Sequence, residues 1–285
     1  MANYTFNKTY DIEEIYAHAD IDSDGLQLLN DRHIVKYRTK TIKSGDILEC
    51  EIYPIWDTRS SMSRAKSTKE SREAQKRLNY KNAIKTAVRL VNTNFTDNDY
   101  WATFTYDEKH LPKSVEDAEK LLQKFIRRLR CYARAHNYPD LKYFYTTEFN
   151  DSPDKPKIRV HHNVIFNFPN RDIAEELWRN GGRNSIRRLV ADKDGYEGLV
   201  RYIMKDPRGA KRYVTSKNFV KPQITVADCK LTRRRVWRLV AGDVEPSTVF
   251  EPMYKNGYYL TRFSAKTSDY VTGAYLYARM YKKRE

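Results

Sequence analysis

Two strand-like runs joined by a turn-rich segment constrain the fold of this chain more than any other feature. The first run is LKYFYTTEF (residues 141–149), and the second is KIRVHHNVIFNF (residues 157–168). Residues 150–156 between them include two prolines, two aspartates, an asparagine and a serine, a composition that cannot continue a central strand. We therefore predict an antiparallel β-hairpin at this point of the chain.

The residues on either side of this hairpin show further strand and helix patterns. WATFTY (residues 101–106) is typical of a strand, and Ser114 with Asp117 has the spacing of a helix capping box. One apolar stripe marks the helix that follows, formed by Leu121, Leu122, Phe125, Ile126, Leu129 and Tyr132. Two more helices are predicted, near residues 172–179 and 197–206. The order of elements predicts an α+β fold with an antiparallel sheet flanked by helices.

The two ends of the chain look like additions to this core. Residues 33–56 predict a β-hairpin, and Ser67 predicts the start of a basic amphipathic helix of about 25 residues. Towards the other end, Asn256-Gly257 predicts a turn, and residues 273–283 a closing strand. We therefore predict three segments, namely an N-terminal hairpin and basic helix (1–95), the core (96–225), and a C-terminal basic helix with a β extension (226–285).

The charge of the chain indicates a polyanionic partner. The 285 residues include 53 Lys and Arg against 37 Asp and Glu, for a net charge of +16. Residues 1–57 are acidic on balance, so the positive charge lies in the rest of the chain, where tyrosines are interleaved with it. This pattern is typical of nucleic-acid surfaces, although solvated helix faces are also often basic. The three cysteines are far apart, and we expect them to be reduced thiols that bind no zinc.

Neither a long apolar run nor a signal peptide is visible. No stretch of eighteen apolar residues occurs, and the first residues lack a basic head followed by an apolar stretch. We expect a cytoplasmic protein that does not contact a membrane.

A glutamate and a histidine of the predicted hairpin are candidates for a metal site. In an antiparallel register centred near residue 154, Glu148 and His161 lie within about one pair position on the same face. His161 and Asn163 share that face, whereas His162 points to the opposite one. The other interpretation is that one histidine packs in the core and its neighbour bonds at the surface.

Tyr202 and Lys205 are candidates for catalysis. They are three residues apart in a short predicted helix, so they share one helix face. A helical tyrosine in a chain with 22 tyrosines is more often a packing residue.

The segment from about Trp101 to Pro222 resembles the HUH endonuclease superfamily. Three motifs carry the resemblance in the right order, namely WATFTYDEKHLP, IRVHHNVIF and LVRYIMKDP. Within that superfamily, the chain looks most like the rolling-circle replication initiators of small single-stranded DNA phages and plasmids. The resemblance implies a core sheet of RRM-like or palm-like topology, and residence in the cytoplasm of a bacterial host cell.

The resemblance also implies a mechanism. Glu148, His161 and Asn163 would hold one Mn²⁺ or Mg²⁺ ion, and Tyr202 would be the nucleophile, assisted by the cation of Lys205. Attack on single-stranded origin DNA would leave a 5′-phosphotyrosyl link and a free 3′-OH for a host polymerase. The family has His-x-His where this chain has His161-His162-Asn163, so three alternatives stay open. Asn163 coordinates the metal, His162 substitutes for it through a bulge, or catalysis is weakened or lost.

The remaining expectations concern partners. Backbone phosphates would be bound by eight basic residues, Arg208, Lys211, Arg212, Lys217, Lys221, Arg233, Arg234 and Arg235. No G-x-x-x-x-G-K-[ST] motif occurs, so we expect no ATPase and a host helicase as partner. Three other functions are weighed against this one. They are a relaxase for plasmid mobilisation, a non-catalytic DNA-binding relic, and an RNA-binding protein, for which an aromatic-rich RNP strand is not evident.

Overall fold

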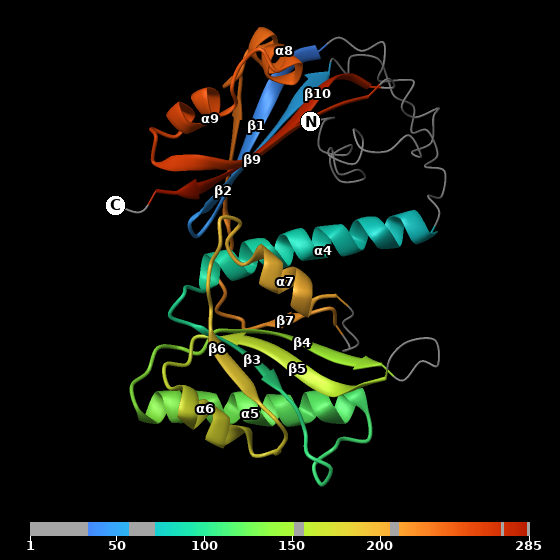
Figure 1. Cartoon of the computed structure of the whole chain (residues 1–285), viewed down its shortest axis with the longest axis vertical. Helices are drawn as coiled ribbons and strands as arrows, with labels where there is room; N and C mark the ends of the chain where they lie inside the picture. Colours follow the sequence, from blue (N-terminus) through green and yellow to red (C-terminus); the bar gives the residue numbers. More distant parts are fainter. Residues whose placement is uncertain (1–33, 57–71, 151–156, 206–210, 269–270, 284–285) are drawn as a thin grey trace. The chain divides into compact units, whose positions relative to one another are not determined.

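The computed structural model describes residues 34–56, 72–150, 157–205, 211–268 and 271–283. The chain forms two compact units, and each is described by itself (Figure 1). Unit 1 comprises Met1–Asn79 and Pro222–Glu285, and unit 2 comprises Tyr80–Lys221. Each unit contains one five-stranded antiparallel sheet, and helices accompany both sheets. The prediction of an α+β fold is confirmed.

Unit 2 contains the predicted hairpin at the centre of its elements. Helix α4 (Arg72–Asn94), which begins in unit 1, precedes β3 (Tyr100–Phe104), α5 (Val115–Ala135), β4 (Tyr143–Asn150) and β5 (Ile158–Phe166). The chain continues through α6 (Arg171–Trp178), β6 (Ser185–Arg188), α7 (Glu197–Ile203) and β7 (Val214–Thr215). The strand order in the sheet is β6-β3-β5-β4-β7. The residues 151–156 that join β4 to β5 lie outside the described part of the chain.

Helices cover both faces of the sheet in unit 2 (Figure 1). On one face, α5 and α6 pack around a core that includes Phe104, Phe125 and Trp178. The centroids of these three rings lie 4.8–5.3 Å apart, and each aromatic pair contributes about 0.5–1.5 kcal/mol beyond simple burial. On the other face, a second core joins α4 and α7 to Phe144 and Ile165. The alternation of side chains along β4 and β5 therefore supplies both cores.

The predicted cap of α5 is present, with one difference. Ser114 Oγ accepts a hydrogen bond from the Asp117 amide at 3.1 Å, as the capping-box spacing predicts. The Asp117 carboxylate, however, contacts Lys120 Nζ at 2.9 Å and is not part of the cap. A lysine one turn along the helix competes for the same carboxylate, and aspartate is shorter than the usual glutamate.

Unit 1 combines strands from both ends of the chain. Strands β1 (Ile34–Ser44) and β2 (Ile47–Trp56) lie beside β8 (Gln223–Asp228), β9 (Tyr258–Ser268) and β10 (Val271–Lys282) in the order β8-β1-β2-β10-β9. Helices α8 (Arg233–Ala241) and α9 (Ser247–Met253) share a core with one face of this sheet.

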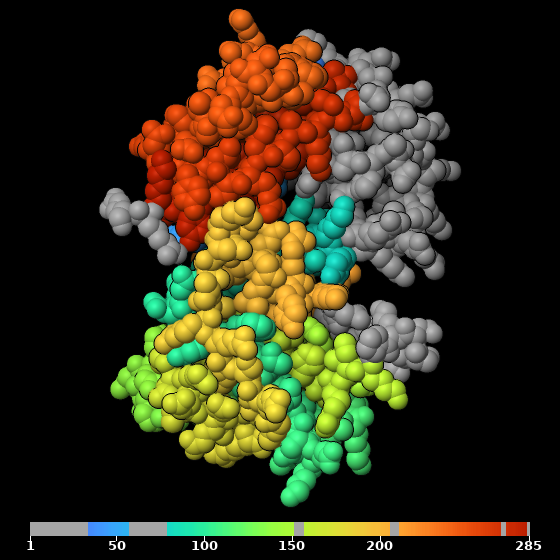
Figure 2. Space-filling view, viewed as in Figure 1, coloured from blue at the N-terminus to red at the C-terminus, as the bar shows by residue number. Residues whose placement is uncertain are grey.

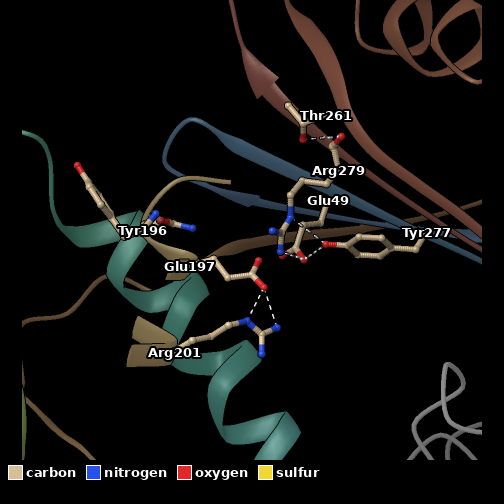
Figure 3. Close-up of polar contacts among 8 residues, drawn as sticks. Glu49, Tyr196, Glu197, Arg201, Thr261, Tyr277 and Arg279 are labelled. Carbon is tan, nitrogen blue, oxygen red and sulfur yellow. Dashed lines mark hydrogen bonds and ion pairs between the residues drawn. The ribbon is translucent and has the colours of Figure 1, made fainter. Parts of the chain in front are cut away.

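The other face of the sheet in unit 1 carries a buried polar network (Figure 3). Tyr277 Oη donates a hydrogen bond to Glu49 Oε1 at 2.6 Å, and Arg279 Nε donates to the same hydroxyl at 3.0 Å. Burial and then the charge of Glu49 raise the pKa of Tyr277, so the phenol stays protonated and remains a donor.

The predicted segments are joined differently in the structure. The hairpin expected at residues 33–56 is present as β1 and β2, but it lies inside the sheet of unit 1. Strand β10 pairs with β2, so segments 1–95 and 226–285 meet in one sheet, because antiparallel pairing is not limited by sequence distance. Ser67, the expected start of the basic helix, lies outside the described residues. Among the described residues, no helix is long and apolar enough to cross a membrane.

Candidate metal and nucleophile site

The register of β4 and β5 brings the two predicted ligands together. Glu148 is the direct partner of His161 in the antiparallel pair, and Asn163 is the partner of Thr146. His161 Nε2 lies 3.3 Å from Glu148 Oε2. Both side chains are mostly buried, with 19% and 17% of their surface exposed. The hairpin expected from the sequence therefore places a carboxylate and an imidazole on one sheet face.

The imidazole of His161 is oriented by the backbone. Its Nδ1 lies 3.1 Å from the carbonyl oxygen of Arg159, which can only accept, so Nδ1 carries a proton. In the neutral ring, the lone pair then lies on Nε2, which faces Glu148. Burial lowers the pKa of His161, but hydrogen bonds to Glu148 and to the Arg159 carbonyl, with the charge of Glu148, raise it above its ordinary value overall. This arrangement matches the orientation that histidine ligands of metals usually have.

Asn163 is the third side chain of this cluster. It is 2% exposed, its Nδ2 donates to Glu148 Oε1 at 3.1 Å, and its Oδ1 accepts from Thr103 Oγ1 at 3.0 Å. Coordination through Oδ1 requires the amide to turn over, which Thr103 permits because a hydroxyl can also accept. The donor set fits an ion such as Mn²⁺ or Mg²⁺, with one carboxylate, one imidazole and one amide. No group of three His, Cys, Asp or Glu in the described residues offers another such site.

His162 lies on the opposite face, as the alternation of strand residues predicts. It is fully buried, with Nε2 2.7 Å from Tyr106 Oη and Nδ1 3.0 Å from Thr147 Oγ1. Burial, reinforced by the nearby His161, lowers the pKa of His162 to about 3. The alternative in which a bulge brings His162 beside His161 differs from the observed register, which is regular across both residues.

Tyr202 lies on α7, which covers the face of the sheet that carries Glu148. Thr146 Oγ1 donates to the carbonyl of Ile203 at 2.8 Å, and Tyr80 Oη donates to the carbonyl of Met204 at 2.9 Å. These bonds fix the end of the helix. Tyr202 is 63% exposed, and its ring packs edge-on against Trp101 at a centroid distance of 6.0 Å. No hydrogen bond joins it to Glu148, His161 or Asn163 within the described residues.

Helix α7 is shorter than the sequence predicts. It ends at Ile203, so Lys205 lies in the turn beyond it, with its amide donating to the carbonyl of Tyr202 at 3.3 Å. The neighbouring Arg201 is held by Glu197, whose Oε1 accepts from Nε at 2.7 Å (Figure 3). The segment from α6 to α7, yellow to light orange, forms a large part of the visible surface of unit 2 (Figure 2).

The predicted phosphate-binding residues belong to both units. Lys211, Arg212, Lys217 and Lys221 are exposed in unit 2, and Arg212 lies over the ring of Tyr80 at 5.9 Å. Arg233, Arg234 and Arg235 form the exposed first turn of α8 in unit 1. Arg208 lies outside the described residues.

Two threonines of the site were missed by the sequence analysis. Thr146 precedes Glu148 by two residues and anchors α7, and Thr103 on β3 holds the Asn163 amide. Polar residues at alternate positions on otherwise apolar strands are a signal that identifies Thr146. Thr103 is found only once the pairing of β3 with β5 is known.

A comparison with protein families bears on this segment of the chain. Residues 99–207 match the family model described as Replication-associated protein ORF2, which covers less than half of the 285 residues. Neither a curated protein nor a solved structure matches the chain. The matched segment contains every strand and helix that carries Glu148, His161, Asn163 and Tyr202. In that segment the chain is therefore similar to replication-associated proteins, which supports a role in DNA replication.

Proposed function

We propose that this chain nicks single-stranded origin DNA through Tyr202 and so initiates rolling-circle replication. The observation that carries the proposal is the direct pairing of Glu148 with His161, on the sheet face that α7 covers. The β-α-β-β-α-β order from β3 to β6 supports an RRM-like core of the HUH type. The family match over residues 99–207 supports the biological role.

The reaction is a phosphoryl transfer to tyrosine. The Tyr202 hydroxyl oxygen attacks the scissile phosphorus and releases its proton, and the bond from phosphorus to O3′ breaks. The leaving O3′ takes up a proton and becomes a free 3′-OH. The phosphate stays attached to the 5′ carbon of the downstream nucleotide, now as an ester of Tyr202. The energy of the phosphodiester is retained, so this step needs no ATP.

The side chains of the site would divide the work. Glu148, His161 and Asn163 would hold Mn²⁺ or Mg²⁺, which polarises a phosphate and neutralises its developing charge when bound. Lys205, close in sequence to Tyr202 and exposed, would stabilise the phenolate and contact phosphate as a point charge. Thr146 and Tyr80 would keep α7 in place. The free 3′-OH would be extended by a host polymerase, and a host helicase would separate the strands.

The test is the formation of a covalent adduct. The full chain is incubated with a pool of labelled single-stranded DNA of random sequence and Mn²⁺, and separated on a denaturing gel. We expect an adduct that chelation abolishes and that Tyr202→Phe removes. Tyr213→Phe is the matched control, because Tyr213 stacks on Phe144 at 5.0 Å in the same unit and has no role in the proposed reaction. An adduct that persists in Tyr202→Phe contradicts the assignment of the nucleophile.

A non-catalytic DNA-binding protein is the second candidate. It is favoured by the orientation of the Asn163 amide, whose nitrogen and not its oxygen faces Glu148. It predicts DNA binding that is insensitive to chelators and no adduct with any strand. The nuclease predicts that Glu148→Ala and His161→Ala abolish the adduct and leave most of the binding. A relaxase would share the chemistry and differ in its DNA, which would be an origin of transfer.

A further inference from the structure

A groove runs along the outer side of α5 in unit 2, away from the Glu148–His161 pair. It consists of two hollows of about 380 and 570 Å³, and both are lined by Arg130 and Tyr143. One hollow extends to Arg134, Asp140 and Lys217, and the other to Lys124 and Arg127. We call this surface the α5–β4 groove.

Four cations of α5 form one side of the α5–β4 groove. Lys124, Arg127, Arg130 and Arg134 are exposed and recur every three or four residues, so they lie along one helix face over about 15 Å. Within the described residues, none of the four forms an ion pair with a carboxylate. The acid that lines the groove is Asp140. A row of unpaired cations at this spacing fits a ligand with repeating negative charge.

Arginine on this helix is not always free. Arg128, which lies outside the groove, donates through Nε to the carbonyl of Leu177 at 2.8 Å and through Nη2 to that of Trp178 at 2.9 Å. It therefore joins α5 to the end of α6. The cations of the groove have no such structural task, apart from the weak bond of Arg130 to the Tyr143 hydroxyl at 3.3 Å.

Tyrosines of β4 form the other side of the groove. The rings of Tyr143 and Tyr145 are stacked, with centroids 6.1 Å apart and an interplanar angle of 23°. The guanidinium of Arg130 lies 5.4 Å from the Tyr143 ring centroid. Tyr143 is half-buried, so part of its surface remains accessible, whereas Tyr145 is buried. Cations beside an accessible aromatic ring are the two elements with which proteins bind unpaired nucleic acid.

We propose that the α5–β4 groove binds single-stranded DNA, with the cations of α5 on successive phosphates and a base against Tyr143. The inference rests on the proposed function, because it assumes a single-stranded DNA substrate. Tyr143 and Glu148 lie five residues apart on β4, or about 17 Å along the strand. DNA in the groove is thus held a few nucleotides from the scissile phosphate, and the groove fixes the position of the substrate.

The test measures binding without cleavage. Full-length Tyr202→Phe is titrated with a fluorescent oligothymidylate in chelator at several salt concentrations, and then with a duplex of the same length. In this background, Arg127→Ala/Arg130→Ala should weaken single-strand binding about tenfold or more and reduce the salt slope of log K by about 1.4, for two lost phosphate contacts. Tyr143→Leu, which keeps apolar bulk, should weaken single-strand binding about tenfold with little change in slope.

Arg171→Ala/Lys193→Ala is the matched control. It removes the same charge from exposed positions of unit 2 that do not line the groove. The proposal is overturned if this pair weakens binding as much as the groove pair, if the groove pair has no effect, or if duplex binding falls equally. Because binding is measured without metal, a failure of the nicking reaction in the adduct assay leaves this result independent.

Discussion

The anchor of α7 allows a prediction with a defined magnitude. Thr146 is 1% exposed, and its hydroxyl donates to the carbonyl of Ile203 at 2.8 Å. Ile203 is the last residue of α7, where helix carbonyls lack partners within the helix. Thr146→Val keeps the shape of the side chain and removes this donor. The buried carbonyl is then left unsatisfied, at a cost of about 1–3 kcal/mol.

This cost should appear as local opening of α7. Because 1.4 kcal/mol corresponds to a factor of ten, amide hydrogen exchange in residues 197–204 should accelerate about 5- to 140-fold. Seven residues form too short a helix to persist alone, so the loss should be confined to this segment. Hydrogen-exchange mass spectrometry measures it directly. Adduct formation should fall in parallel, because Tyr202 lies on the same helix.

Thr86→Val is the matched control for this prediction. Thr86 Oγ1 also donates to a carbonyl, that of Asn82 at 2.8 Å, but it is exposed and lies within α4, so water replaces the lost bond. Its effect on stability should stay below about 0.5 kcal/mol. If exchange in α7 is the same in Thr146→Val and Thr86→Val, the Thr146 bond does not anchor α7 and the reasoning is refuted.

Three further predictions follow from other sites. Asn163→His should raise Mn²⁺ affinity about tenfold in calorimetry, because imidazole is a stronger donor than an amide, and a fall would show that this position does not face the ion. Burial raises the pKa of Cys50 to about 11, so an alkylating reagent at pH 8 should label only the two exposed cysteines until the protein unfolds, and labelling of all three thiols in the native state would contradict this. Gly182→Ala should lower stability by more than about 1 kcal/mol, because φ is +82° and a Cβ would lie 2.6 Å from the Thr105 carbonyl oxygen, whereas Gly198→Ala, with open space around it, should not lower the melting temperature.

Local patterns were sufficient to predict the centre of the site. The turn formers between residues 150 and 156 and the alternation on each strand predicted that Glu148 and His161 share a face, and the structure pairs them directly. The same alternation separated His162 from His161. These features depend on a hairpin, whose register is set by residues close in sequence.

The rest of the site and most of unit 1 depend on contacts between distant residues. The orientation of the Asn163 amide is set by Thr103, on a strand whose pairing cannot be derived from its own pattern. Likewise, β8 was interpreted as part of a basic stretch, although its residues alternate in a strand-like way, because its partner β1 lies far away in sequence. The side-chain period gives a face, but the choice of neighbouring strand requires the tertiary structure.

The continuity of unit 2 and the division of unit 1 have a consequence for synthesis on the ribosome. Strands β1 and β2 emerge early, but a two-stranded hairpin is only marginally stable by itself. The residues joined by the Trp56–Thr272 hydrogen bond are 216 positions apart, so most of the chain must be made before that contact forms. Unit 2 is complete in one stretch and can fold first, as contiguous domains generally do. The early hairpin must therefore remain soluble until its partners arrive, and a chain that ends near Lys221 would contain a complete unit 2 but no sheet for β1 and β2 to join.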